Sequence, residues 1–179
     1  MPEGLEQALI NRAKQGDRSA YESLLEPALR PATRLAFAML RDRSDAEDAF
    51  QESALRAWRR LGNLRPGSPF TAWFLGIVAN QCRESRRARW RQFVRLPDVM
   101  PASGLDESTW LEEEDLRRAV SALPHDQRVA VLLHFHLDLT LSDVAVALGI
   151  SPAGVRTRIK RALRRLRPAV GISEATVNG

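Results

Sequence analysis

Apolar residues recur every three or four positions along most of the chain, and this spacing predicts amphipathic α-helices. No alternation of apolar and polar residues lasts long enough to predict a strand. Pro27 and Pro31 fall within the second helix and must kink or split it. We therefore predict an all-α fold, whose helices cover approximately residues 5–15, 19–40, 44–61, 69–91, 111–123, 126–136, 141–148 and 152–168.

Polar residues that typically cap helices precede several of these segments. Ser44 and Glu47 match a capping box, in which each side chain accepts a hydrogen bond from the backbone amide of the other. Ser68 stands before Pro69 in the arrangement of an N-cap followed by proline at the first helical position. Thr140 is expected to cap the helix that follows it. These signals predict where the third, fourth and seventh helices begin.

The last two predicted helices are joined by a short turn at residues 149–151 that contains glycine. This arrangement is typical of a helix-turn-helix, whose second helix enters the major groove of DNA. One face of that helix should be buried, and it carries Val155, Ile159, Ala162 and Leu166. The opposite face should reach base edges, and the flanks should reach phosphates. The base-edge candidates are Ala153, Arg156, Thr157, Lys160 and Arg164, and the phosphate candidates are Arg158, Arg161 and Arg165.

The charge of the chain is concentrated in two basic blocks. Over 179 residues, 27 Lys and Arg against 22 Asp and Glu give a net charge of +5 and a pI near 10.5. Six arginines and one acid lie between Arg83 and Arg95, and seven basic residues and no acid lie between Arg156 and Arg167. Together the blocks carry +12, which leaves −7 for the remainder. A polyanionic partner such as nucleic acid is therefore indicated.

An acidic segment separates the two basic blocks. Seven acids and no base lie between Asp98 and Asp115, in a stretch that also contains Pro, Ser and Gly. This composition is typical of a flexible linker. We therefore predict two small helical domains, an N-terminal one over residues 1–95 and a C-terminal one over residues 112–170, with an acidic linker at 96–111 and a tail at 171–179.

The composition also excludes several classes of protein. Cys82 is the only cysteine, so neither an intrachain disulfide nor a thiolate zinc cluster is expected. No stretch approaches the roughly 20 apolar residues that span a bilayer, and the first residues lack the pattern of a secretory signal. We expect a soluble intracellular protein that is held together by packing, with no cofactor, no metal ion and no membrane partner.

Several short motifs follow one another in order from about Tyr21 to Arg167. They are Asp45-Ala46-Glu47-Asp48 with Gln51-Glu52 and Trp58, Phe70-Thr71-Ala72-Trp73-Phe74 with Ala79-Asn80, Leu123-Pro124 with Arg128, and Asp143-Val144-Ala145 through Leu148-Gly149-Ile150-Ser151 to Gly154-Val155-Arg156, Arg158 and Arg161-Ala162. In order and spacing they resemble the bacterial RNA polymerase sigma factors of the extracytoplasmic-function subgroup.

The resemblance implies a cytoplasmic, all-helical transcription initiation factor with no enzymatic activity of its own. Such a factor binds RNA polymerase core, and its C-terminal helix-turn-helix recognises the −35 element of promoter DNA. Its N-terminal domain recognises and melts the −10 element. Members of the family are often held by an anti-sigma factor, and nothing in these residues identifies one.

The predicted helix 44–61 carries an acidic face. Asp45, Asp48, Gln51 and Glu52 lie on its polar side, and the like charges of Asp48 and Glu52 one turn apart invite a cationic partner. A solvated surface is the default interpretation of such a face on an isolated helix. The resemblance implies instead that Asp48, Gln51 and Glu52 dock on the helical clamp of the largest polymerase subunit.

The first basic block is the candidate for contacts with the −10 element. Melting DNA requires a pocket or aromatic groups for unstacked bases and cations that follow the backbone. With the resemblance, the loop 62–69 is expected to hold a flipped base around Asn63 and Leu64. The contacts expected from the following helix, all on one side of it, are Asn80, Arg83, Arg86 and Arg87.

Aromatic residues and family departures add four expectations. Trp73 should pack in the core with Phe70 and Phe74, because aromatics at helical spacing usually do, whereas Trp90 should be more exposed. Asp138 stands where the family usually has glycine, and aspartate can occupy the left-handed conformation at some cost. Residues 151–154 differ from the usual pattern of the family, so the base preferences of family members cannot be transferred to this chain.

The acidic linker has two interpretations. It is a spacer by composition, whereas the resemblance implies a path through the polymerase toward the RNA exit.

Two other functions explain parts of the chain. An ordinary helix-turn-helix regulator would account for residues 140–167 but would leave the acidic face and the first basic block without a function.

An enzyme is suggested by His134 and His136 with Asp138 and the nearby His125. However, His134 and His136 point about 200° apart on a helix, and no further ligand set or Gly-rich phosphate loop accompanies them. We therefore predict no catalytic residue and no metal site.

Overall fold

The computed structural model describes residues 3–95 and 111–170, with side chains placed for residues 4–89 and 115–167. Within these ranges every regular element is a helix, which confirms the predicted all-α class. The predicted linker, the tail and the side chain of Trp90 lie outside the described parts. The elements are α1 (Glu3–Lys14), α2 (Arg18–Leu40), α3 (Arg43–Arg60), the 3-10 turn η1 (Leu61–Asn63), α4 (Phe70–Arg95), α5 (Leu111–Ala122), α6 (His125–Val131), the π-helical turn η2 (Leu132–His136), α7 (Leu141–Leu148) and α8 (Pro152–Val170).

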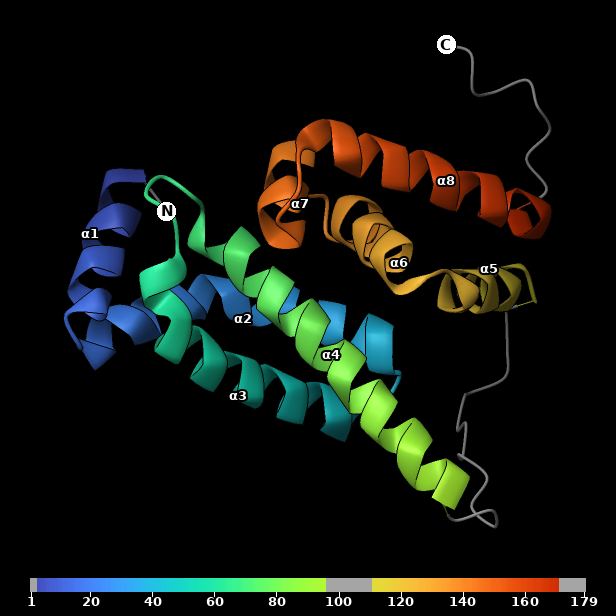
Figure 1. The fold of residues 1–179 in the computed structure, drawn as a ribbon, viewed down its shortest axis with the longest axis horizontal. Helices are drawn as coiled ribbons and strands as arrows, with labels where there is room; N and C mark the ends of the chain where they lie inside the picture. The colour runs from blue at the N-terminus through green and yellow to red at the C-terminus, as the bar shows by residue number, and fades with distance from the viewer. Residues whose placement is uncertain (1–2, 96–110, 171–179) are drawn as a thin grey trace.

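The N-terminal unit is a bundle in which α2, α3 and α4 pack against one another, with α1 against α2 (Figure 1). Aromatic rings fill its centre: Tyr21 lies 4.9 Å from Trp58 and 6.0 Å from Phe70, measured between ring centroids. Phe70 and Phe74 are buried and Trp73 is half-buried against the same core, which confirms the predicted packing of these three aromatics. The side chain of Tyr21 also donates to the carbonyl of Ala54 at 2.7 Å, which ties α2 to α3.

Pro27 and Pro31 were predicted to kink or split α2, and the helix runs unbroken through both of them, so they do not split it. Each proline removes a backbone donor from the helix. Both prolines lie away from the fully buried stripe of the helix, which contains Leu24, Ala28, Ala32 and Leu35. Burial of that stripe against α3 and α4 offsets the missing hydrogen bonds.

Two of the three helices whose N-caps were predicted begin differently. The N-cap of α3 is Asp42, which accepts a hydrogen bond from the amide of Asp45 at 2.8 Å, and Ser44 lies inside the first turn. A carboxylate two residues earlier serves as well as a serine, so the helix begins earlier. Helix α4 begins at Phe70, one residue later than predicted, and its first amide donates to Glu6 of α1 at 2.8 Å.

The C-terminal unit contains the predicted helix-turn-helix. Thr140 caps α7 by accepting from the amide of Asp143 at 3.1 Å, and Gly149 ends α7 with φ of 64°. Asp138 has φ of 54°, so it occupies the left-handed conformation where the family usually has glycine. The four residues predicted to be buried in α8, namely Val155, Ile159, Ala162 and Leu166, are all buried. One feature was not predicted, because α6 continues into η2 through a wider π-helical turn.

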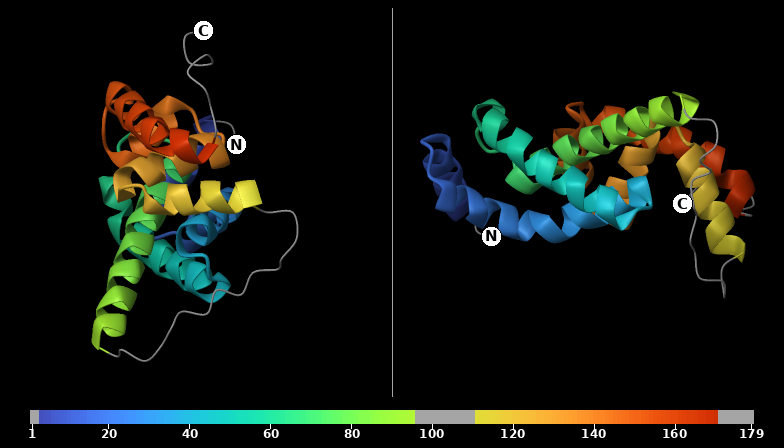
Figure 2. Two further views of the ribbon diagram at one scale, coloured as in Figure 1. Left: turned by 90° about the vertical axis from the view of Figure 1, so that its right-hand side faces the viewer. Right: turned by 90° about the horizontal axis from the view of Figure 1, so that it is seen from below.

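The two units are in direct contact. Helix α4 of the N-terminal unit packs against α7 of the C-terminal unit, and α2 touches η2 (Figures 1 and 2). One hydrophobic cluster extends from Phe74 and Leu75 to Val144 and Val155. The described helices therefore form one packed body rather than two separated ones.

Candidate polymerase-binding and nucleic-acid-binding surfaces

The predicted docking face of α3 is at the surface. Asp48 and Gln51 are exposed and Glu52 is half-buried. Glu52 accepts a hydrogen bond from Nε of Arg56 at 3.3 Å, so its charge has a cationic partner within its own helix. Leu55 follows one turn after Gln51 and is 55% exposed. The i, i+3, i+4 and i+7 spacing puts Leu55 on the same face as the three predicted residues, and the sequence reasoning missed it.

Asp45, one turn before Asp48, is engaged by α4. Its carboxylate forms an ion pair with Arg89 of α4, and only 24% of its side chain is exposed. Burial raises the pKa of Asp45 above its ordinary value, and the charge of Arg89 opposes this rise. Asp45 therefore joins α3 to α4 and is less exposed than Asp48, although both lie on the polar side of the helix.

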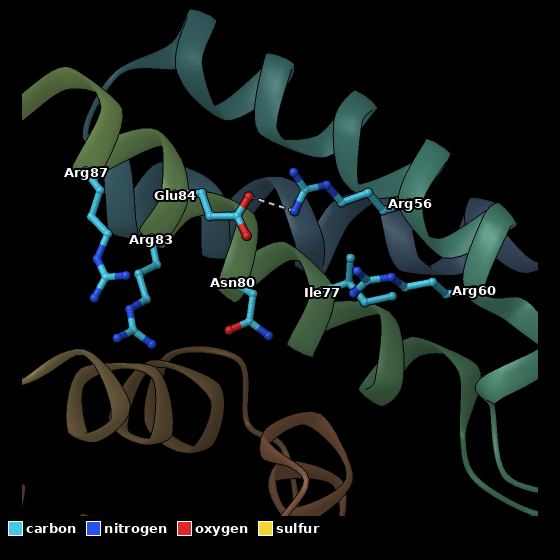
Figure 3. A pocket seen from close by; sticks show the side chains of 7 residues that line it. All are labelled: Arg56, Arg60, Ile77, Asn80, Arg83, Glu84 and Arg87. Carbon is cyan, nitrogen blue, oxygen red and sulfur yellow. Dashed lines mark ion pairs between the residues drawn. The ribbon is translucent and has the colours of Figure 1, made fainter. Parts of the chain in front are cut away.

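A cationic cavity of about 220 Å³ lies between α3 and α4 (Figure 3). Asn80, Arg83 and Arg87, three of the four predicted helical contacts, line it together with Arg56 and Arg60 of α3. Ile77 and Glu84 complete the lining. Arg86 is exposed but is not among the residues that line the cavity. The sequence reasoning missed Arg56 and Arg60, which follow the docking face along the same helix.

Arg56 is the most constrained cation of this cavity. Its guanidinium forms an ion pair with Glu84 at 2.7 Å, which Figure 3 shows, and another with Glu52 at 3.3 Å. The hydrogen bond that Arg56 donates to Glu84 is the largest of the effects that raise the pKa of Arg56. Two carboxylates thus hold Arg56, whereas Figure 3 shows Arg83 and Arg87 pointing away from α4.

Of the two residues predicted to hold a flipped base in the loop before α4, only one has a side chain exposed to solvent. Asn63 is exposed, whereas Leu64 is 2% exposed and packs in the core. The carbonyl of Leu64 accepts a hydrogen bond from Nζ of Lys14 at 3.0 Å. A second cavity, of about 380 Å³, lies between α1 and residues 67–69 of this loop. Helix α1 also fixes the loop, because Gln7 accepts from the amide of Gly67 at 3.3 Å.

Helix α8 presents the predicted recognition surface. The exposed residues on it include all five base-edge candidates, namely Ala153, Arg156, Thr157, Lys160 and Arg164. Thr157 donates to the carbonyl of Ala153 at 3.0 Å, so its hydroxyl already has one partner within the helix. Arg161 and Arg165 are exposed, whereas Arg158 is half-buried with a guanidinium nitrogen 3.8 Å from a carboxylate oxygen of Asp126.

The histidines do not gather into a site. Nδ1 of His134 lies 2.8 Å from the carbonyl of Leu139, and its ring packs against Phe135. Among the described residues, no group of three or more His, Cys, Asp or Glu side chains could hold a metal ion. In the same part of the chain, no helix is both long and apolar enough to cross a membrane.

Two family models match the chain. The model described as sigma-70 region 2 matches residues 24–92, which include the docking face of α3 and the cationic cavity. The model described as sigma-70, region 4 matches residues 113–166, which include the helix-turn-helix. Together the two matches span more than half of the chain.

Individual relatives agree with these matches. The ECF RNA polymerase sigma factor SigM of Mycobacterium tuberculosis is 33% identical over 165 residues, covering 91% of this chain and 83% of that protein. The RNA polymerase sigma-H factor of Pseudomonas aeruginosa is 27% identical over 172 residues, covering 88% of this chain and 89% of that protein. The sigma factor RpoE of Bartonella quintana, solved with the anti-sigma factor NepR, has a similar fold, with a TM-score of 0.66, 24% identity, and coverage of 86% and 98%. The chain therefore belongs to the extracytoplasmic-function sigma factors, which are transcription initiation factors that direct RNA polymerase to promoters.

Proposed function

We propose that three surfaces of this sigma factor each bind a different partner during transcription initiation. The face of α3 with Asp48, Gln51, Glu52 and Leu55 binds RNA polymerase core. The cationic cavity between α3 and α4 holds the opened −10 element. Helix α8 reads the −35 element in the major groove. We propose that the protein does this without catalytic chemistry of its own, in the cytoplasm, with residues 1–95 and 112–170 as its two domains.

The observation that carries the proposal is the double role of α3. One side of this helix carries the exposed Asp48 and Leu55 with the half-buried Glu52, and another side sends Arg56 and Arg60 into the cavity. An apolar anchor within a polar rim is typical of protein interfaces. A pocket of arginines beside an asparagine suits a single strand, because the cations follow phosphates while the amide can bind a base edge. Core and DNA would thus meet on adjacent sides of one rigid element.

Because Leu64 is buried, we no longer assign its side chain to the pocket for a flipped base of the −10 element. The side chain of Asn63 remains a candidate for a flipped base, whereas Leu64 supports the loop from the core. Asn80, Arg83 and Arg87 line the cavity, and we add Arg56 and Arg60 as phosphate contacts. Arg86 is assigned to a neighbouring stretch of the same strand.

On α8, we assign Arg156 and Lys160 to base edges, with Ala153, Thr157 and Arg164 beside them. Arg161 and Arg165 would contact phosphates. Arg158 can do so only after leaving Asp126. We also propose an anti-sigma factor as a further partner, by analogy with the RpoE structure of similar fold.

The experiment that tests the docking face is a binding measurement with purified RNA polymerase core. The double variant Asp48→Lys/Glu52→Lys should lose affinity for core while keeping its circular-dichroism spectrum, because both side chains lie at the surface of a helix. Glu22→Lys/Glu26→Lys is the matched control, since it makes the same charge change at two exposed positions one turn apart on α2. Equal affinities of the two double variants for core would refute the assignment.

A further inference from the structure

Helix α1 lies alongside the loop 62–69 and is joined by hydrogen bonds to the backbone at three points (Figure 1). In each bond a side chain of α1 meets a backbone group of the loop or of the first residue after it. The three bonds are from Nζ of Lys14 to the carbonyl of Leu64 at 3.0 Å, from the amide of Gly67 to Gln7 at 3.3 Å, and from the amide of Phe70 to Glu6 at 2.8 Å. The end of α1 thus holds the start of the loop, and the start of α1 holds the end of the loop.

The spacing of these bonds along α1 matches the reach of the loop. Gln7 and Lys14 are about two helical turns apart, which is a rise of about 10 Å. Leu64 and Gly67 are three residues apart, and an extended chain spans at most about 11 Å over that separation. Two turns of α1 therefore support this part of the loop over its whole length.

Gln7 acts at a turn within the loop. Gly67 has φ of 73°, a left-handed conformation that glycine adopts without strain. The amide of Ser68 donates to the carbonyl of Arg65 at 3.1 Å, which closes the turn. Nε2 of Gln7 donates to Asn11 at 3.1 Å, so the side chain that accepts from Gly67 is itself held in place.

Glu6 supplies a cap that the sequence before α4 lacks. The residue before Phe70 is Pro69, whose side chain has no oxygen to accept from the first amides of the helix. Glu6 accepts from the first of these amides, and its negative charge is favourable at the N-terminus of a helix. A side chain of α1 therefore fixes the point at which the loop ends and α4 begins.

Helix α1 is in turn fixed to the N-terminal bundle. Its residues Ile10 and Ala13 are buried in the core of that bundle. The guanidinium of Arg12 donates to Asp17 at 2.7 and 2.9 Å, and Asp17 caps α2 by accepting from the amide of Ala20 at 3.0 Å. The loop is thus held by a helix that cannot move independently of the bundle.

We propose that the three side chains of α1 that bond to this backbone are positioning residues for recognition of the −10 element. They hold the loop in the shape in which Asn63 can receive a flipped base, so DNA binds without the entropic cost of ordering the loop. This inference rests on the proposed function, because it assumes that the loop contacts the opened −10 element. The sigma-70 region 2 model matches residues 24–92, which begin after α1, so that match gives these side chains no role.

Hydrogen exchange of the full-length protein, followed by NMR, tests whether α1 orders the loop. In Glu6→Ala/Gln7→Ala the amides of Gly67 and Phe70 should exchange about tenfold faster than in the wild type, because both lose their acceptors. Glu6→Gln keeps an acceptor oxygen and should leave the amide of Phe70 protected. Glu22→Ala removes a carboxylate from an exposed position of α2 and is the control. Wild-type exchange at both amides in the double variant would overturn the proposal.

Selection of single-stranded DNA tests the consequence for recognition. The wild-type holoenzyme selects from a library with a randomised segment, and the enriched sequence then serves as the probe. Glu6→Ala/Gln7→Ala should bind this probe about tenfold more weakly while keeping its affinity for core. It should also lose base preference at the position where Asn63→Ala loses it. Wild-type affinity and preference in the α1 variant would overturn the positioning role.

A double-mutant cycle distinguishes positioning from a general loss of stability. If α1 acts through Asn63, then adding Glu6→Ala/Gln7→Ala to Asn63→Ala should weaken binding of the probe little further than Asn63→Ala alone. Losses that multiply would contradict action through Asn63. Glu22→Ala, added to Asn63→Ala in the same way, should leave the affinity for the probe unchanged.

The outcomes separate this inference from the proposed function. If Asn63→Ala alone leaves affinity and base preference unchanged, the loop does not hold the base, and the proposed function fails at this site. If Asn63→Ala weakens binding and the α1 variants do not, the proposed function stands and the positioning role is overturned.

Discussion

Arg56 and Glu84 form an ion pair at 2.7 Å that joins α3 to α4 on the wall of the cationic cavity. Because Nε of Arg56 also donates to Glu52, one guanidinium links the polymerase-docking face to the surface proposed for single-stranded DNA. While both carboxylates hold it, Arg56 contributes little net charge to the cavity. A cationic residue of the polymerase that pairs with Glu52 would weaken the ion pair between Glu52 and Arg56.

Removing the charge of Glu84 should therefore strengthen DNA binding. Glu84→Gln leaves Arg56 less neutralised, so the holoenzyme should bind a single-stranded oligonucleotide more tightly, with a salt slope steeper by about 0.7. The stability of the free protein should fall by only about 0.2–1 kcal/mol, because the pair is partly exposed. Fluorescence anisotropy over a salt series measures the affinity. Glu47→Gln, whose ion-pair partner Arg43 lies outside the cavity, is the control, and equal affinities for the two variants would contradict the cavity assignment.

The exposed Leu55 should contribute strongly to core binding. Leu55→Asp puts a charge on the docking face, and an apolar anchor of an interface is typically worth about 2 kcal/mol, or roughly thirtyfold in Kd. Because Leu55 is at the surface, the melting temperature of the free protein should change little. Leu29→Asp replaces a leucine of α2 with 49% exposure and serves as the control. A Kd for core within twofold of the wild type would remove Leu55 from the interface.

The sequence predicted those elements whose signals are local. The spacing of apolar residues located the described α-helices. The bounds of the helix-turn-helix followed from the capping residues Thr140 and Gly149 and from the buried apolar face of α8. The caps of α3 and α4 were misassigned for different reasons. Asp42 competes with Ser44 as a cap only two residues away, and the partner of the first amide of α4 is Glu6, which is 64 residues distant. No local pattern reveals a cap of that kind.

On α8, two arginines should differ in how they affect specificity. Arg156→Ala should weaken binding at the −35 element by about 1–3 kcal/mol and relax its sequence preference, as expected for a contact to a base edge. Arg165→Ala should weaken binding to all sequences about equally and reduce the salt slope by about 1. Footprinting of the holoenzyme on wild-type and scrambled −35 templates measures both effects. An unchanged preference in Arg156→Ala would exclude this side chain from base recognition.

Acid should separate the two units. Burial lowers the pKa of His125 to about 4, with Arg83, Arg128 and Arg86 lowering it further and Asp126 opposing them. Separation would return this pKa toward its ordinary value near 6.5, so the packed form binds fewer protons. Its stability is therefore complete above about pH 6.5 and is lost as the pH falls toward 4. The radius of gyration should rise between about pH 7 and pH 5 with no loss of helical circular dichroism.

The matching variant for this pH dependence is His125→Gln, which removes the titrating group and keeps a polar side chain. Its radius of gyration should not change between about pH 7 and pH 5. A wild type that stays compact at the lower pH, or a variant that expands to the same extent as the wild type, would exclude His125 as the group that responds to acid.

The remaining features depended on tertiary packing that sequence patterns do not encode. Leu64 lies in a polar loop, yet its side chain fills the core. Arg60 belongs to the cavity only because α3 runs beside α4. Gly76 resembles an ordinary helical glycine, yet a Cβ atom there would overlap the carbonyl oxygen of Ala147 in α7. The charge blocks indicated nucleic acid, but they did not show that Arg83 and Arg86 would face His125 of the other unit.

The central claim is that this chain directs RNA polymerase to promoters through both units. Run-off transcription with purified core on genomic fragments tests it most directly, when each responsive template is repeated with its −10 or its −35 element scrambled. We expect discrete transcripts that require the protein and that are lost when either element is scrambled. Core that yields no specific transcript with the protein present, or transcripts that survive both changes, would contradict the account.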